Sequence, residues 1–385
     1  MTPFVKSLTK VILILAAATL VLVLAVSLTI PKQQKLSYGV TFSQKFSDEL
    51  NGGPDAKVGA GWKQNYLAIL DDLKVKNLRL IAYWDKIEPE EGRFGFEDLD
   101  WQVAEAEKRG AKIILVVGRK VPRWPECHEP EWARFSTPPG KKSDFFGISK
   151  SDFEEGGVFQ RTSLKGGGEN TPPPLRGGGK GVGFLLHYVE EVVKHYRSNP
   201  AIIAWQIENE PLFPFGECGT TPISLLNQEI KLVKSLSDKP IILTDSGELG
   251  FAWPYLAAKS DIFGTTLYRY INNRFLGDIR YSLIPAYYFR IKAWWAERVL
   301  GKQIFISELQ AEPWASESLK NIPVEWQNKK MNPEIFNEII DYAERSGFPK
   351  AYFWGAEWWY WMKEKHGKPE MWDNAKALFN TNQQI

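Results

Sequence analysis

The sequence contains little cysteine and little histidine. Its 385 residues include two cysteines and four histidines, and no two histidines have the spacing of metal ligands near the end of a predicted strand. The run "HEPEW" at residues 128–132 is the nearest approach to such a pattern. The sequence therefore gives no reason to expect a metal-dependent hydrolase, and we predict neither a metal nor another cofactor.

A strong charge of one sign is also absent. The chain has 48 basic and 46 acidic residues, which gives a net charge of +2. Such a balance offers no basic surface for nucleic acid, so we expect no nucleic-acid partner. The glycine runs at 166–168 and 177–179 lack a preceding strand and the Gly-Lys-Ser/Thr ending of a phosphate-binding loop.

One long uncharged run is present near the start of the chain. Residues 11–30 are apolar or small, and they are numerous enough to span a bilayer as a helix. Lys6 and Lys10 precede the run and would keep the N-terminus in the cytoplasm. We expect an uncleaved transmembrane anchor within residues 1–37, with the rest of the chain outside the cytoplasm. A signal peptide cleaved near residues 25–27 would instead release a secreted domain, and a buried core helix is a third interpretation.

From residue 38 onward, short apolar runs alternate with amphipathic helical stretches. Near-continuous apolar strands that alternate with helices indicate a parallel sheet covered on both faces. Eight such units predict a (β/α)8 (TIM) barrel over residues 38–385. An open doubly wound sheet is the alternative, but no glycine-rich turn follows an early strand. The expected strands are residues 38–42, 77–83, 112–118, 202–207, 240–245, 262–268, 303–308 and 351–356.

Residues 138–182 interrupt this alternation. They are rich in glycine and proline and show little periodicity, which disfavours a packed core. We interpret them as a mobile insertion after the third strand. A lid over the barrel mouth is one role for such an insertion.

Two glutamates end predicted strands. Glu210, in "WQIENEP", follows the fourth strand, and Glu308, in "QIFISE", ends the seventh. In a barrel both lie at the C-terminal face, where catalytic residues gather. Glycoside hydrolysis uses two carboxyl groups that flank one scissile bond. The high aromatic content, 14% with 16 tryptophans, agrees with a carbohydrate substrate, because flat amphipathic rings suit sugars.

These motifs resemble the glycoside hydrolases of clan A, the cellulase-like family 5 and its relatives. The resemblance covers most of residues 38–378 and includes the run "WDKIEPEEGRFGF" at residues 84–96. It implies that Glu210 is the acid/base and Glu308 the nucleophile of a retaining enzyme. Glu308 would attack the anomeric carbon while Glu210 protonates the leaving oxygen, and water activated by Glu210 would then release the sugar.

The resemblance also implies roles for other side chains. Arg79 would lie beside the nucleophile, Tyr268 would donate a hydrogen bond to it, and Asn209 would bind the sugar 2-hydroxyl. Arg79 and Tyr268 would keep Glu308 ionised. Arg79 as a structural ion pair and Tyr268 as a core residue are the alternatives. Trp354, on the eighth strand, resembles the floor of the sugar site.

Two further tryptophans follow strand ends. Trp124, in "RKVPRWPEC", and Trp314, after "QAEP", are candidate aromatic walls of the substrate site, or else they pack within loops. Cys127 and Cys218 follow the third and fourth strands, so they lie in adjacent loops on one face. In an exported domain they would form a disulfide, with two free thiols as the alternative.

Each proposed catalytic residue has a rival nearby. Glu208 is the rival acid, but we expect it to point away from Glu210 unless a bulge alters the strand end. Glu312 is the rival nucleophile, although it lies beyond the strand. The sequence also departs from the cellulase-like pattern, because the third strand ends "VVGRK" without a histidine and Thr266 replaces a histidine on the sixth. A neighbouring clan A family is therefore possible.

Two other functions fit the same residues. A surface-anchored carbohydrate-binding barrel would keep the fold without catalysis. An envelope transglycosylase would use the same two carboxyl groups with a sugar acceptor. The sequence leaves the glycan, the linkage and endo or exo action open.

Overall fold

The computed structural model describes most of the chain beyond its start. The described residues are 35–52, 60–133, 180–273, 277–315 and 317–382, with a few positions between 10 and 25. Within them, no helix combines the length and the apolar character needed to cross a membrane. Most of the run at 11–30, and nearly all of the insertion at 138–182, lie outside the described residues.

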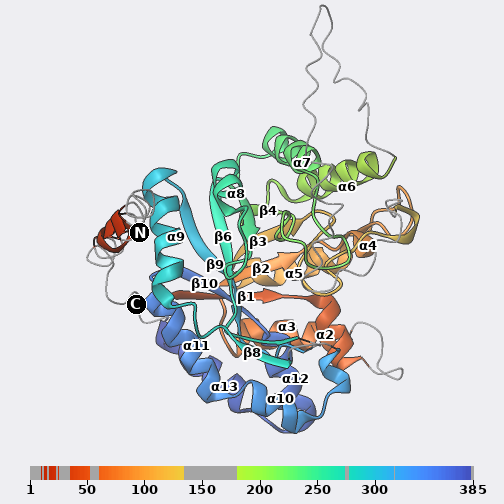
Figure 1. The fold of residues 1–385 in the computed structure, drawn as a ribbon. Coiled ribbons are helices and arrows are strands. Elements are labelled where there is room, and N and C mark those ends of the chain that lie inside the picture. The colour runs from red at the N-terminus through yellow and green to blue at the C-terminus, as the bar shows by residue number, and fades with distance from the viewer. Residues whose placement is uncertain are drawn as a thin grey trace, which may run out of the picture.

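Eight parallel strands close into a barrel in the described part of the chain, as predicted. Their order around the ring is β1-β10-β9-β6-β5-β4-β3-β2, so each strand pairs with its neighbours in sequence and β1 pairs with β10. Figure 1 shows the ring of strands at the centre with helices around it. The strands are β1 (Ser37–Phe42), β2 (Asn77–Ile81), β3 (Lys112–Val117), β4 (Ile202–Ile207), β5 (Ile241–Asp245), β6 (Ile262–Leu267), β9 (Gln303–Gln310) and β10 (Lys350–Trp354).

The helices cover the outside of this ring, because one stripe of each is apolar and packs against the strands. Between β6 and α9 lies a short antiparallel hairpin of β7 (Tyr270–Asn273) and β8 (Gly277–Arg280). The helices are α2 (Gln44–Asn51), α3 (Ala60–Asp71), α4 (Trp84–Ile87), α5 (Glu97–Lys108), α6 (Lys180–Tyr196), α7 (Ile223–Leu236), α8 (Trp253–Lys259), α9 (Ala286–Val299), α10 (Val324–Lys330), α11 (Pro333–Ser346), α12 (Ala356–His366) and α13 (Glu370–Asn382), with 3-10 turns at Glu131–Ala133 and Leu319–Asn321.

Strand β4 shows how alternation builds the site. Trp205 and Ile207 pack into the large core between strands and helices, whereas Ala204 belongs to the small apolar cluster inside the barrel. Successive side chains of a strand point to opposite faces. Gln206 therefore shares the inward face of Ala204 but stands one layer closer to the C-terminal end. The interior changes there from apolar to polar.

A one-residue irregularity in β9 decides where Glu308 points. The register shifts between Ile306 and Glu308 where β9 pairs with β6, and again near this point where it pairs with β10. Ile304 and Ile306 face the outer core, and so does Leu309, which breaks the two-residue alternation. A bulge of this kind re-aims the next side chain. Glu308 consequently points into the barrel, whereas in a regular strand it would point outward.

Candidate functional site

Glu308 is held at the barrel mouth by two donors, one on each carboxyl oxygen. Arg79 Nη1 donates to Oε1 over 2.9 Å, and the Tyr268 hydroxyl donates to Oε2 over 2.9 Å. The carboxyl group is almost entirely buried, as are both partners. Charge-assisted hydrogen bonds in such surroundings stabilise the ionised form of a carboxylate. The sequence placed Arg79 and Tyr268 beside Glu308, and the structure brings all three into contact.

Arg79 joins Glu308 to the end of β4. Its Nε donates to Gln206 Oε1 over 2.7 Å, and its Nη2 donates to Asn209 Oδ1 over 2.8 Å. The Arg79 side chain has no exposed surface. A buried ion pair that loses one partner costs about 3–5 kcal/mol, so Arg79 and Glu308 depend on each other. The same contacts fix the amide orientation of Asn209, the residue expected to bind the sugar.

Glu210 is anchored through its backbone and leaves its carboxyl group uncommitted. Its N–H donates to Thr244 Oγ1 over 2.9 Å, and its carbonyl accepts from Lys120 Nζ over 2.9 Å. Among the residues that the structure describes, Oε1 of Glu210 has no hydrogen-bond partner. Burial, then the charges of Glu308 and Glu126, raises the pKa of Glu210 well above its ordinary value. These surroundings favour the protonated form of the Glu210 carboxyl group.

Glu208 points away from this pair. Its carboxylate accepts hydrogen bonds from the backbone N–H groups of Arg119 (2.9 Å) and Lys120 (2.7 Å) after β3. Gly118 allows this close approach, since a Cβ there would lie 2.8 Å from Glu208 Oε1 and its φ is +130°. Both Glu208 (φ 57°) and Glu210 (φ 44°) are in the left-handed region. This turn sends the two carboxyl groups in different directions.

Glu312, the rival nucleophile, is engaged elsewhere. Arg123 contacts both of its oxygens and also donates to Glu357 Oε2 over 3.1 Å. Burial raises the pKa of Glu312 to about 7, against the lowering effect of Arg123. The guanidinium of Arg123 also lies over the ring of Trp354, 4.1 Å from its centroid. One face of Trp354, the expected floor of the site, is thus covered by Arg123.

An aromatic series leads outward from Tyr268. The ring of Trp314 lies 5.0 Å from that of Tyr268, Phe215 lies 5.8 Å from Trp314, and Trp124 lies 6.0 Å from Phe215. Trp124 is 67% exposed at the outer end. Phe215 was not singled out by the sequence. Trp124 and Trp314, predicted as walls of the substrate site, are thus joined through Phe215 to Tyr268, the partner of Glu308.

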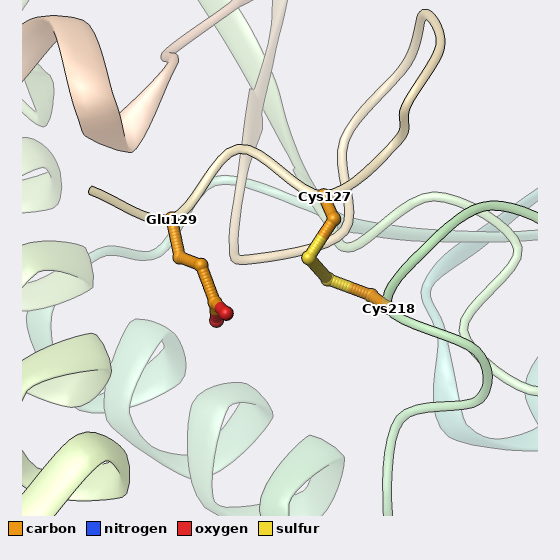
Figure 2. Close-up of side chains that lie close together, drawn as sticks. All are labelled: Cys127, Glu129 and Cys218. Atoms are coloured by element: carbon orange, nitrogen blue, oxygen red, sulfur yellow. A yellow bond between two sulfur atoms is a disulfide. The ribbon is translucent and has the colours of Figure 1, made fainter. Parts of the chain in front are cut away.

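Cys127 and Cys218 form a disulfide that joins the loops after β3 and β4, with Cα atoms 5.1 Å apart. Within the described residues, Glu129 lies beside the two sulfur atoms in a group with metal-ligand chemistry (Figure 2). The sulfur atoms are bonded to each other, however, and Glu129 pairs with Arg119 at 2.9 Å. A disulfide lacks the thiolate that binds metals. This group is a covalent brace between two loops of the mouth.

Comparison with known proteins agrees with this geometry. The family model of glycoside hydrolase family 42, described as beta-galactosidase, matches residues 59–146. That segment is less than half of the chain and contains Arg79 and the run at 84–96. Arg79 and Tyr268 contact Glu308, as the resemblance to clan A implied. The matched segment therefore resembles a glycoside hydrolase of clan A. No curated protein sequence matches it significantly.

Solved structures of clan A proteins share the barrel at low sequence identity. A β-galactosidase of the haloarchaeon Halorubrum lacusprofundi is 14% identical (TM-score 0.55, 90% of this chain and 58% of that one), and one of Bacillus circulans is 13% identical (TM-score 0.55, 92% and 57%). A GH5_18 variant of Bifidobacterium longum in complex with Manβ1-4GlcNAc is 10% identical (TM-score 0.50, 83% and 69%). The chain spans less than two thirds of the length of these β-galactosidases.

The two departures from the cellulase-like pattern have structural replacements. Thr266, in place of a histidine, donates to Glu248 Oε2 over 3.2 Å, and Glu248 Oε1 accepts the N–H of Tyr268 over 2.6 Å. Lys120 stands after the third strand and donates to the carbonyls of Glu210 and Phe213. Both replacements support residues of the site through the backbone.

Sequence reasoning missed several residues that the fold brings to this site. Arg123 and Glu126 come from one loop, and Gln206 and Thr244 from strand interiors. The signal available for the loop was four charged residues within "RKVPRWPEC", between a buried strand and a cysteine. Gln206 and Thr244 gave a weaker signal. Each is a polar side chain at an inward-facing strand position, one layer below the mouth of the barrel.

Proposed function

We propose that this protein is a retaining glycoside hydrolase of clan A that cleaves O-glycosidic bonds of a β-linked oligo- or polysaccharide. Glu308 acts as nucleophile and Glu210 as acid/base. The observation that carries this assignment is the contrast between the two carboxyl groups. Glu308 accepts hydrogen bonds from Arg79 and Tyr268 on its two oxygens, whereas Glu210 has a free oxygen and a raised pKa.

In the first step, a carboxylate oxygen of Glu308 attacks the anomeric carbon, and the bond to the leaving oxygen breaks. Glu210 gives its proton to that oxygen, so the leaving group departs as a neutral alcohol. Arg79 and Tyr268 hold both oxygens of Glu308 in place before the bond forms. Asn209 Oδ1 is occupied by Arg79 and one N–H of its Nδ2 donates to Glu126, so the second N–H is the one to offer to the sugar.

In the second step, Glu210, now ionised, removes a proton from water. The water oxygen attacks the anomeric carbon, and the bond to Glu308 breaks. Two displacements at one carbon give a product with the configuration of the substrate. Two carboxyl groups at the end of one barrel, one ionised and one protonated, are what this sequence of steps requires.

The substrate class rests on the aromatic series and on the relatives. The rings of Trp314, Phe215 and Trp124 offer flat apolar surfaces next to Tyr268, which suits the apolar faces of sugar rings. The β-galactosidases and the GH5_18 protein with bound Manβ1-4GlcNAc suggest β-galactosides and β-mannosides as the first substrates to assay.

The test is hydrolysis of a panel of p-nitrophenyl and natural β-glycosides by the full chain, with the first-formed anomer read by ¹H NMR. We expect turnover of at least one β-glycoside and a β-anomer product before mutarotation. An α-anomer would contradict the double displacement. Glycan binding without turnover would favour the carbohydrate-binding barrel, and a dominant transfer product would favour the transglycosylase.

We further propose that residues 11–30 direct the barrel out of the cytoplasm and anchor it in the membrane. Their apolar length and the flanking lysines support this, as does the Cys127–Cys218 disulfide, because such bonds persist in oxidising compartments. In a bacterial host, we expect the full chain in the membrane fraction, degraded by protease added to spheroplasts. A chain lacking residues 1–36 should stay protected in the cytoplasm. Protection of both forms would refute the proposal.

A further inference from the structure

A third carboxyl group, that of Glu126, lies beside the proposed catalytic pair. Glu126 follows β3 and is 4% exposed. Its Oε1 accepts a hydrogen bond from Asn209 Nδ2 over 3.3 Å. Its Oε2 is 3.9 Å from Lys120 Nζ and has no hydrogen-bond partner in the described part of the chain. The group is thus buried, half satisfied and in contact with the residue that precedes Glu210.

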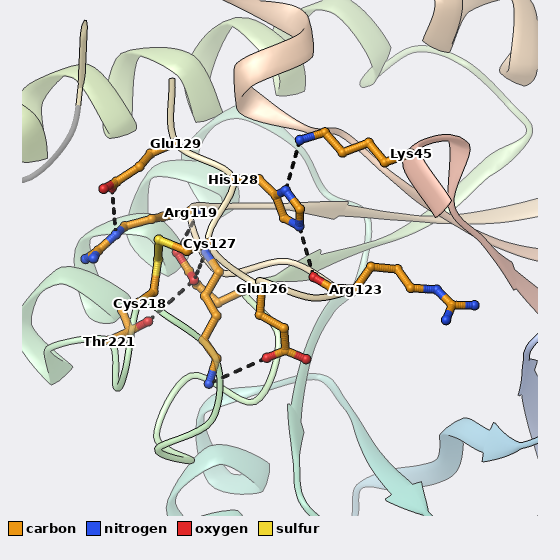
Figure 3. Close-up of a disulfide and its surroundings, with 11 residues drawn as sticks. Lys45, Arg119, Arg123, Glu126, Cys127, His128, Glu129, Cys218 and Thr221 are labelled. Carbon is orange, nitrogen blue, oxygen red and sulfur yellow. Dashed lines mark hydrogen bonds and ion pairs between the residues drawn. A yellow bond between two sulfur atoms is a disulfide. The ribbon is translucent and has the colours of Figure 1, made fainter. Parts of the chain in front are cut away.

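The backbone around Glu126 is fixed from both sides. Glu126 has a φ of 59°, a conformation that a non-glycine residue adopts only when its surroundings hold it there. Gly216 makes room for it, because a Cβ at Gly216 would lie 2.7 Å from the Glu126 Cβ. The disulfide joins the next residue, Cys127, to Cys218 on the same loop as Gly216. Glu126 and Glu129 point to different sides of the Cys127 loop (Figure 3).

The charged groups that act on Glu126 come from three neighbouring elements. Lys120 is at the end of β3, Arg79 is on β2, and Glu308 is on β9. Glu210, after β4, feels the charge of Glu126 in turn. Lys120 contacts both residues, since its Nζ donates to the backbone carbonyl of Glu210 over 2.9 Å and lies 3.9 Å from Glu126 Oε2. Three acidic groups therefore share two cations within one buried site.

We propose that Glu126 is a positioning residue whose negative charge keeps Glu210 protonated at alkaline pH. This inference rests on the proposed function, in which Glu210 must hold a proton to start the reaction. A carboxyl group near two others loses its proton less readily, because like charges in a buried site repel. While Glu126 is ionised, Glu210 therefore retains its proton to higher pH than it would without that charge.

The pKa shifts of Glu126 and Glu210 agree with this proposal. Burial raises the pKa of Glu126 to about 8, with the charge of Glu308 adding to the rise and Lys120 and Asn209 opposing it. The pKa of Glu210 is also raised well above its ordinary value, by burial and by the charges of Glu308, Glu126 and Asp245, with Lys120 opposing. The protons come off as coupled steps that belong to the pair. Removing one of the two carboxyl groups should therefore lower the pKa of the one that remains.

The first test compares the pH dependence of kcat/KM in wild type and Glu126→Gln, which keeps shape and removes the charge. The alkaline limb should move to lower pH by about one unit, while the acid limb stays. Glu126→Asp, which keeps a carboxyl group, should lie closer to wild type. The exposed Glu217→Gln, on the opposing loop, is the matched control and should not move either limb. An unmoved limb in Glu126→Gln overturns the proposal.

The second test does not need turnover, so it separates this proposal from the proposed function. A carboxyl group whose pKa is raised in the folded state destabilises the protein as the pH rises. The free energy of unfolding then falls between the unfolded-state pKa, about 4.3, and the folded-state pKa of Glu126, about 8. Glu126→Gln lacks that loss, so its melting temperature should rise relative to wild type between pH 5 and 9. The same holds for Glu210→Gln, and the two gains should be non-additive in the double variant. Additive gains, or none, contradict the coupling even if no glycoside is cleaved.

Discussion

Replacement of Glu308 by alanine is expected to lower kcat by a factor on the order of 10⁴ to 10⁶, the loss seen when a catalytic nucleophile is removed. The reason is geometric. Arg79 and Tyr268 hold the two oxygens of Glu308 in place, and no other carboxylate can take its position. Glu312, the nearest rival in sequence, is held by Arg123. The measurement is steady-state hydrolysis of an aryl β-glycoside.

Rescue of the Glu308→Ala variant by azide gives a second test of the same role. The variant leaves a space beside the anomeric carbon that a small anion can enter, so azide should restore part of the rate and give a glycosyl azide of inverted configuration. Glu317→Ala, an exposed glutamate beyond the same strand, is the matched control and should keep wild-type turnover. Circular dichroism checks that Arg79, left without its partner, has not unfolded the barrel. Activity within tenfold of wild type in Glu308→Ala removes Glu308 from the mechanism.

Replacement of Glu210 by alanine is expected to affect substrates according to their leaving groups. Glycosides of simple alcohols need a proton on the departing oxygen, so their kcat/KM should fall about 10² to 10⁴-fold. Dinitrophenyl glycosides leave without that help, so their first step should change little. Their second step still needs a base, and a covalent intermediate should therefore accumulate. A pre-steady-state burst and the mass of the trapped intermediate measure this.

The pH dependence of activity tests the same role of Glu210. Wild-type Glu210 must be protonated for the first step, and its pKa is raised by burial and by the charges of Glu308 and Glu126. Wild-type activity should accordingly fall as the pH rises through that pKa, and the alkaline limb should vanish in Glu210→Ala. Azide should rescue this variant with retained configuration, opposite to Glu308→Ala. Equal losses on all leaving groups would argue against an acid/base role, and Glu217→Gln again serves as the unaffected control.

The site shows why some residues could be predicted from sequence and others could not. Glu210 and Glu308 follow buried strands, and a charge at the end of an apolar run is visible without coordinates. Arg79 interrupts "NLRLI" in the same way. Glu126 and Arg123 carry no such signal, because their directions depend on a loop whose turns set Glu126 toward Asn209 and Arg123 toward Glu312.

The barrel could be predicted from the local sequence pattern of the chain. Eight apolar runs of strand length, separated by amphipathic helices, leave few arrangements in which all apolar faces are buried, and a closed ring of parallel strands is one of them. The same local pattern placed two glutamates at one end of that ring. What only the tertiary structure decided is the direction of each carboxyl group. A bulge in β9 turned Glu308 inward, and a left-handed turn separated Glu210 from Glu208, since both depend on pairing partners distant in sequence.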